Sequence, residues 1–255
     1  MKGPRVREGG TEMRRYALIF LIAVELLMSF SFLGYFHIDP ISITTAYIPV
    51  LLAGALTGPA EAAAVGTVFG LVSMWKASAS YVMAGDQLFS PFLSGDPLGS
   101  VLLSVGSRFL FGLAAGLLYA GARRLRPTGF WVAAVSFCGK AVHALMVYSV
   151  MGLFFPEAGF GPADALSGFF KPLDIASNLI TAGAVLALWL LANSQAWLRF
   201  QRRVAVSQSQ EAGRQRHWLS LIPVILVTAA AALAVTFYFV HRIDYVLEIN
   251  GIELT

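Results

Sequence analysis

Charged residues are scarce in this chain, and their scarcity limits what the protein can be. They make up 13% of the 255 residues, whereas a soluble domain carries about 25%. Hydrophobic residues make up 57%, and the mean hydropathy is +0.71. A soluble chain of this length has too little polar surface to cover so large an apolar fraction. The composition therefore predicts an all-α fold, a polytopic transmembrane helical bundle.

Cysteine and the common catalytic motifs are also scarce or missing. The single cysteine, Cys138, lies inside an apolar run, which excludes a disulfide framework. The sequence has no Walker A motif, no HExxH, no CxxC and no nucleophile elbow. We therefore expect a protein that is not an enzyme, with no catalytic residues, no metal site and no cofactor. Any transport must draw its energy from a gradient or from a partner.

Apolar runs of about 20 residues predict membrane-spanning helices. The second run is short, because its roughly 14 residues rise only about 21 Å, and it ends at Gly58-Pro59. It either crosses the membrane where the bilayer is thinned or forms a re-entrant segment. Seven runs qualify, at 16–36, 45–58, 60–82, 100–122, 130–153, 172–198 and 218–240.

The distribution of basic residues favours a crossing by the second run. With the N-terminus in the cytoplasm and all seven runs crossing, thirteen basic residues fall inside and only Lys171 and Arg242 fall outside. This asymmetry obeys the positive-inside rule. It predicts a multi-pass protein of the cell (plasma) membrane, with a cytoplasmic N-terminus and an extracytoplasmic C-terminus. It also explains the net charge of +4 by topology, so nucleic acid is not an expected partner.

The predicted spans divide the chain into five segments. The outside loops 83–99 and 154–171 are long and rich in Pro, Gly, Phe and Asp. They are interpreted equally well as lids over a site or as segments that dip into the membrane interface. The segments are a basic cytoplasmic N-terminus (1–15), a six-helix membrane domain (16–198), a basic cytoplasmic linker (199–217), a seventh transmembrane helix (218–240) and an extracytoplasmic stub (241–255).

Ionisable side chains inside the predicted spans are the candidate functional residues. A charge in lipid is costly unless it faces protein, water or ligand. Three strong cations, Lys76, Arg108 and Lys140, fall in the outer half of the first six spans. A pocket there suits an anionic or carboxylate-bearing small molecule. The predicted binding residues are Trp75 (for stacking), Lys76, Arg108, Lys140, His143, Tyr148 and Asn178 (for orientation), and Asp174.

Several of these residues have a structural interpretation as well. Glu25 lies at a depth close to that of Lys140, so the two are candidates for a buried ion pair. His143 is alternatively a core histidine, and Asp174 a helix-start residue favoured by the helix dipole. Small residues repeat every four positions and predict close helix packing within the protein. They are Ala62, Gly66 and Gly70 in one run and Gly112, Gly116 and Ala120 in the next.

Two segments resemble the S component, the substrate-binding membrane subunit, of energy-coupling factor (ECF) vitamin transporters. They are IPVLLAGALTGPAEAAAVGTVFGLVSMWKA at 48–77 and FSPFLSGDPLGSVLLSVGSRFLFGLAAGLLY at 89–119. The shared features are a short Pro-containing second helix that ends in Gly-Pro, the FSP loop, and an arginine followed by a Gly/Ala-rich helix. The resemblance covers roughly residues 16–195.

This resemblance implies a binder of a vitamin or related micronutrient, with its site near the outer face. Uptake in that family is driven by a separate transmembrane coupling subunit and two cytoplasmic ATPases. The chain departs from the family at Ala17 and Ala23, which are six apart where many members have an Ala-x-x-x-Ala docking face. Residues 199–255 also extend beyond the six-helix unit. They support an alternative function, a membrane-embedded ligand-sensing input domain of a signalling protein that does not transport.

Overall fold

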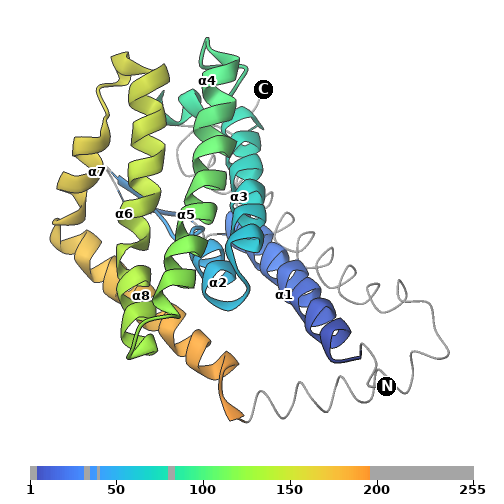
Figure 1. Ribbon diagram of the computed structural model, residues 1–255. Coiled ribbons are helices and arrows are strands. Elements are labelled where there is room, and N and C mark those ends of the chain that lie inside the picture. The colour runs from blue at the N-terminus through green and yellow to red at the C-terminus, as the bar shows by residue number, and fades with distance from the viewer. Residues whose placement is uncertain (1–4, 32–34, 39–40, 80–83, 196–255) are drawn as a thin grey trace, which may run out of the picture.

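A computed structural model describes residues 5–31, 35–38, 41–79 and 84–195 of the chain. This part is mostly helical (Figure 1). The predicted linker 199–217, seventh helix 218–240 and stub 241–255 lie outside the described residues. The elements in chain order are α1 (Arg5–Ser29), β1 (Tyr35–Ile38), β2 (Ile41–Thr44), α2 (Ile48–Leu56), α3 (Pro59–Ala79), the 3₁₀ turn η1 (Ala84–Phe89), α4 (Pro97–Val101), the π-helical turn η2 (Leu102–Gly106), α5 (Ser107–Ala122), α6 (Thr128–Phe154), the 3₁₀ turn η3 (Pro156–Ala158), α7 (Pro162–Phe169) and α8 (Pro172–Ala192).

Three helices within the described residues are long and apolar enough to cross a membrane. They are the continuous helix Pro97–Ala122, then Thr128–Phe154 and Pro172–Ala192. A helix lies in each of the six runs predicted within 16–198, but α1, α2 and α3 do not meet the same criteria of length and hydropathy. The three apolar helices support a membrane-embedded protein.

The end of the first run was predicted incorrectly. Helix α1 ends at Ser29 instead of continuing to residue 36, and an antiparallel hairpin of β1 and β2 follows it. The strands read YFHI and ISIT. Aromatic and β-branched residues of this kind favour strands. The fold is therefore not entirely α-helical.

Helix α2 forms the centre of the core. Seven of its nine residues, Pro49 to Ala55, are buried, and the helix packs against α1, α3, α5 and α8. A helix that is apolar on every side is stable only when it is surrounded. Pro49 stands in the first turn, where its missing N–H leaves one fewer donor to satisfy.

Helices α3 and α5 approach so closely that only glycine fits between them. A Cβ atom built on Gly66 would lie 2.3 Å from the Arg108 carbonyl oxygen, and one on Gly112 would lie 2.2 Å from the Ala62 oxygen. A Cβ on Gly116 would lie 2.4 Å from the Pro59 Cα. The small-residue repeats therefore pack against each other within the protein, as the sequence predicted.

This contact gives a direct stability prediction. A Gly112→Val substitution must push the two backbones apart and should destabilise the protein by about 1–3 kcal/mol. The matched control is Gly121→Val in the same helix, where a Cβ meets nothing within 4 Å. Thermal unfolding of the detergent-purified protein should show a clearly lower midpoint for Gly112→Val. Equal midpoints for the two variants would contradict the close approach.

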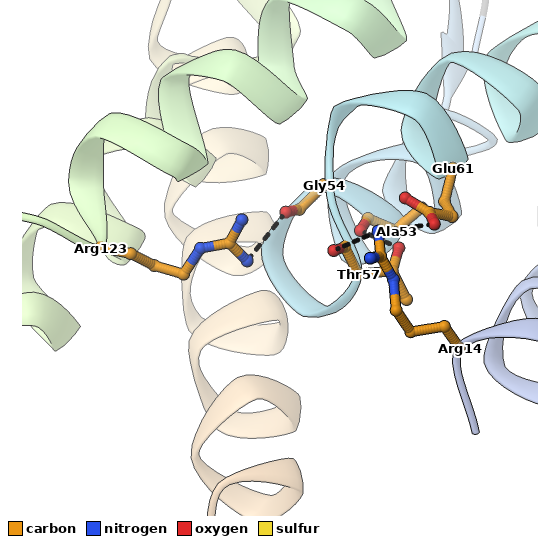
Figure 2. Close-up of polar contacts among 6 residues, drawn as sticks. All are labelled: Arg14, Ala53, Gly54, Thr57, Glu61 and Arg123. Atoms are coloured by element: carbon orange, nitrogen blue, oxygen red, sulfur yellow. Dashed lines mark hydrogen bonds and ion pairs between the residues drawn. The ribbon is translucent and has the colours of Figure 1, made fainter. Parts of the chain in front are cut away.

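Two arginines approach the C-terminal end of α2 from opposite sides (Figure 2). Arg123, which follows α5, donates to the Ala55 carbonyl at 3.0 Å. Arg14 of α1 donates to the Thr57 carbonyl at 3.4 Å and to Glu61 at 2.7 Å. The last carbonyls of a helix lack intrahelical partners and carry partial negative charge, so cations stabilise this end. The arginines thus satisfy carbonyls at an end of α2 that lies at the surface of the bundle, where Leu56, Arg14 and Arg123 are exposed.

Removing one of these arginines tests its role at α2. Arg123→Leu should lower the free energy of unfolding by about 1–2 kcal/mol, because charged hydrogen bonds to the α2 carbonyls are lost. Arg124→Leu, at the exposed neighbouring position, removes the same charge from the same loop and serves as the control. Thermal or denaturant unfolding distinguishes the two. A loss of the same size in both variants would indicate that only the loop charge matters.

Candidate ligand-binding site

A cluster of polar side chains lies buried in the middle of the helical bundle. Its members are Glu25 of α1, Arg108 of α5, His143 of α6 and Asn178 of α8, and all four are buried. Ionisable residues at such positions in a membrane protein are rare and mark functional sites. The cluster therefore defines the candidate site.

His143 stands in an aromatic box. Its ring is stacked on Tyr47 at 6.1 Å and on Phe69 at 5.6 Å between centroids, and it meets Phe111 edge-on at 5.1 Å. Its Nε2 atom is buried and has no hydrogen-bond partner among the described residues. The three aromatic rings thus fix the position of the His143 ring and leave its Nε2 atom without a partner in the described part of the chain. A histidine that only filled the core would be expected to have this atom hydrogen-bonded.

Arg108 is held at the junction between the π-helical turn η2 and α5. Its Nη1 donates to the Leu103 carbonyl at 2.7 Å, within the turn that precedes it. Its guanidinium lies over the rings of Phe69 at 5.2 Å and Phe89 at 4.8 Å. Single π-helical turns inside α-helices are frequent at functional sites. Here the turn places a cation beside the aromatic box.

Glu25 faces Arg108 and does not pair with Lys140. Its Oε1 accepts a hydrogen bond from Ser29 at 2.8 Å, and Oε2 has no hydrogen-bond partner among the described residues. The Arg108 guanidinium acts on this carboxylate electrostatically. Lys140 forms its ion pair with Asp174 instead. The Glu25–Lys140 pair considered from the sequence is therefore wrong.

The inner face of α8 carries three polar residues one turn apart. Asp174 pairs with Lys140, and Thr181 hydrogen-bonds the Tyr47 hydroxyl at 3.0 Å. Between them lies Asn178, which is 1% exposed. Neither of its amide atoms has a hydrogen-bond partner among the described residues. The face thus presents two satisfied groups with an open amide between them.

Of the remaining predicted residues, Lys76 borders this cluster through Ser29, whose hydroxyl bonds Glu25, and Trp75 and Tyr148 lie at its edges. Trp75 is 56% exposed and meets Phe30 edge-on. Lys76 donates to the Ser29 carbonyl at 3.0 Å. Tyr148 stacks on Phe160 at 5.5 Å, near the start of α7. The structure brings Arg108, Lys140, His143, Asp174 and Asn178 into the same core and leaves these three at its edges.

Sequence reasoning missed the aromatic and hydroxyl residues of the site. Tyr47, Phe69 and Phe111 line the box, and Thr181 anchors Tyr47. Apolar residues in an apolar span carry no signal that separates a site from a core. The one available signal was Tyr47, a polar aromatic residue immediately before the short second helix.

The loop between α3 and α4 is folded against the helix that carries Arg108. Ser104 donates to the Phe89 carbonyl at 2.7 Å, and Ser100 donates to the Leu88 carbonyl at 2.7 Å. These contacts hold Phe89 over Arg108, whereas Phe92 in the same loop is exposed. At Phe89 the loop therefore lies against a residue of the candidate site, and at Phe92 it is exposed.

The Lys140–Asp174 pair can be measured with double-mutant cycles. Lys140→Met and Asp174→Asn should each destabilise the protein, and the double variant should lose less than the sum, with a coupling of about 1–3 kcal/mol. The cycle of Lys140→Met with Glu25→Gln should show no comparable coupling. Thermal unfolding of the three single and two double variants supplies both values. Strong coupling to Glu25 would contradict this pairing.

Comparison of the chain with models of known protein families and with curated protein sequences gives no match. The resemblance to ECF S components therefore rests on the sequence features described above and stays a prediction.

Proposed function

We propose that the chain is the substrate-binding membrane subunit of an ECF-type transporter and binds a small vitamin-like molecule. One observation carries the proposal. Glu25 Oε2, His143 Nε2 and both amide atoms of Asn178 are buried without hydrogen-bond partners among the described residues. A membrane interior has no water to satisfy such groups, so each costs free energy until something binds it. A polar ligand provides the missing partners.

The other buried polar groups of the bundle argue against a purely structural role for this cluster. The Tyr119 hydroxyl pairs with Ser136 at 2.7 Å, and Tyr47 pairs with Thr181. These groups are satisfied within the protein, as structural polar groups normally are. Glu25, His143 and Asn178 carry unsatisfied atoms on α1, α6 and α8, and Tyr47 links two of these residues, because it stacks on His143 and bonds Thr181 one turn from Asn178.

The proposal includes a membrane orientation and partners. The arginines that follow α5 would face the cytoplasm, in accord with the positive-inside rule. The chain has no nucleotide-binding motif, so uptake would be driven by a separate coupling subunit and two cytoplasmic ATPases. The site would lie between mid-membrane and the outer face. The protein would reside in the plasma membrane with its N-terminus inside.

A ligand-sensing input domain is the second candidate function. It is favoured by the basic segment 199–217 and the apolar run 218–240, which extend beyond the six-helix unit. Such a protein would use the same binding site without transport. Uptake of the bound compound together with co-purified ATPase subunits would support the transporter, and a bound compound without either would support the sensor.

Native mass spectrometry of the detergent-purified full chain tests the binding function. We expect the wild-type protein to retain a small molecule. His143→Phe keeps an aromatic ring in the box but removes its nitrogens, and Asn178→Leu removes the open amide, so both should lose most of the bound molecule. Asn193→Leu, at the exposed end of the same helix, should retain it. The proposal is contradicted if no molecule is retained, or if the site variants retain as much as the control.

A further inference from the structure

The turn between α5 and α6 concentrates exposed positive charge at one end of the bundle. It has five residues, of which Arg123, Arg124 and Arg126 are arginines. Arg123 donates to the Ala55 carbonyl at the end of α2. Arg124 and Arg126 are exposed, and neither side chain forms a hydrogen bond or an ion pair with a described residue. The turn therefore presents two guanidinium groups that no described residue neutralises.

The acidic group seen at this end of the bundle is already paired. Glu61 lies 2.7 Å from Arg14, on the side of α2 opposite Arg123 (Figure 2). It therefore does not compensate the charge of Arg124 and Arg126. An exposed guanidinium pair of this kind is suited to a phosphate, which Arg binds through parallel, charge-assisted hydrogen bonds.

Exposed apolar side chains on both sides of the turn place it at a membrane surface. The turn joins Pro97–Ala122 to Thr128–Phe154, and both helices are long and apolar enough to cross a membrane. Leu118, one turn before the end of α5, is exposed, and so are Phe130 and Trp131 in the first turn of α6. Tryptophan is enriched at the level of the lipid headgroups. The arginines thus stand next to side chains that lipid covers.

The length of the turn keeps its backbone close to this level. Five residues cover at most about 3.5 Å each, so a turn that leaves and returns rises at most about 9 Å. The headgroup layer on each side of the hydrocarbon core is about 5–8 Å thick. An acidic segment of another protein would have to enter this layer to reach the arginines, whereas lipid phosphates are already there. The geometry therefore favours lipid as the occupant.

We propose that the α5–α6 turn is a binding surface for anionic phospholipid. Arg124 and Arg126 pair with the headgroup phosphate, and Phe130 and Trp131 contact the acyl chains beside it. A zwitterionic lipid carries its own compensating cation, so the two arginines prefer a headgroup with net negative charge. This surface is independent of the ligand-binding function, because none of its residues belongs to the candidate site.

Quenching of Trp131 fluorescence measures which lipid lies beside the turn. The full chain is placed in nanodiscs of equal parts phosphatidylcholine and phosphatidylglycerol, with bromine on the acyl chains of one lipid or the other. Bromine quenches tryptophan only at short range, so the difference from Trp131→Phe reports the lipid at this position. We expect a preference for phosphatidylglycerol of about tenfold or more, which should decrease at high salt.

Two double variants assign the preference to the arginines. Arg124→Gln with Arg126→Gln should remove most of the preference, because both charges are lost. Arg124→Lys with Arg126→Lys keeps the charges and should retain most of it. The basic segment 199–217 is unchanged in every variant, so its attraction for anionic lipid does not produce a difference between them. If the glutamine double variant does not fold, Arg126→Gln alone should lower the preference by about fivefold.

Two results would overturn the proposal. Equal quenching of Trp131 by the two brominated lipids would show that the turn does not select anionic lipid, and would leave an acidic protein segment as the partner of the arginines. An equal preference in the wild type and in the glutamine variants would assign the selection to other basic residues of the chain.

Discussion

The rest of the structure depends on the need to satisfy the backbone of a short helix inside an apolar bundle. Helix α2 has nine residues and is therefore only about 13 Å long, so it cannot cross a full membrane by itself. Arg14 and Arg123 satisfy carbonyls at its C-terminal end, and Pro49 removes one donor at its start. Because α2 is short, its N-terminal end lies deep in the bundle and places Tyr47 beside His143. One end of α2 is thus stabilised by arginines, and the other end positions Tyr47, which lines the site.

The contact of α3 with α5 fixes the position of the cation in the same way. A backbone carbonyl at Arg108 lies against Gly66, with no room for a side chain between them. This contact and the Leu103 hydrogen bond restrain Arg108 from two sides. Phe69 and Phe111 lie one turn beyond Gly66 and Arg108 and both face His143. Glycines that carry no chemistry therefore decide which side chains can meet in the core.

The sequence predicted where helices form better than which residues meet. Hydropathy located helices in six runs, and the cost of buried charge selected Arg108, Lys140, His143 and Asp174, which all lie in the bundle. Depth along the helices suggested Glu25 as the partner of Lys140, whereas Lys140 pairs with Asp174. Depth alone defines neither the rotation of a helix about its axis nor which helix is its neighbour. Trp75 faces outward for the same reason. The aromatic box escaped prediction because a phenylalanine in an apolar span has the same hydropathy in a site as in a core. The hairpin after α1 was missed because Tyr35 and Phe36 extended the first apolar run, and the other strand residues lay in the gap between the first two predicted spans.

Two kinds of polar residue coexist in this core, and the difference between them bears on function. Lys140 with Asp174 and Tyr47 with Thr181 are closed pairs that fix how α8 sits against α6 and α2. Asn178 lies between those pairs on the same helix face, so its position is set from both sides while its own groups stay open. A buried amide that only stabilised the fold would be expected to form a hydrogen bond within the protein, as the neighbouring Thr181 does with Tyr47. An amide that is held in place and left unpaired is preorganised, so a ligand that reaches it does not have to order the side chain.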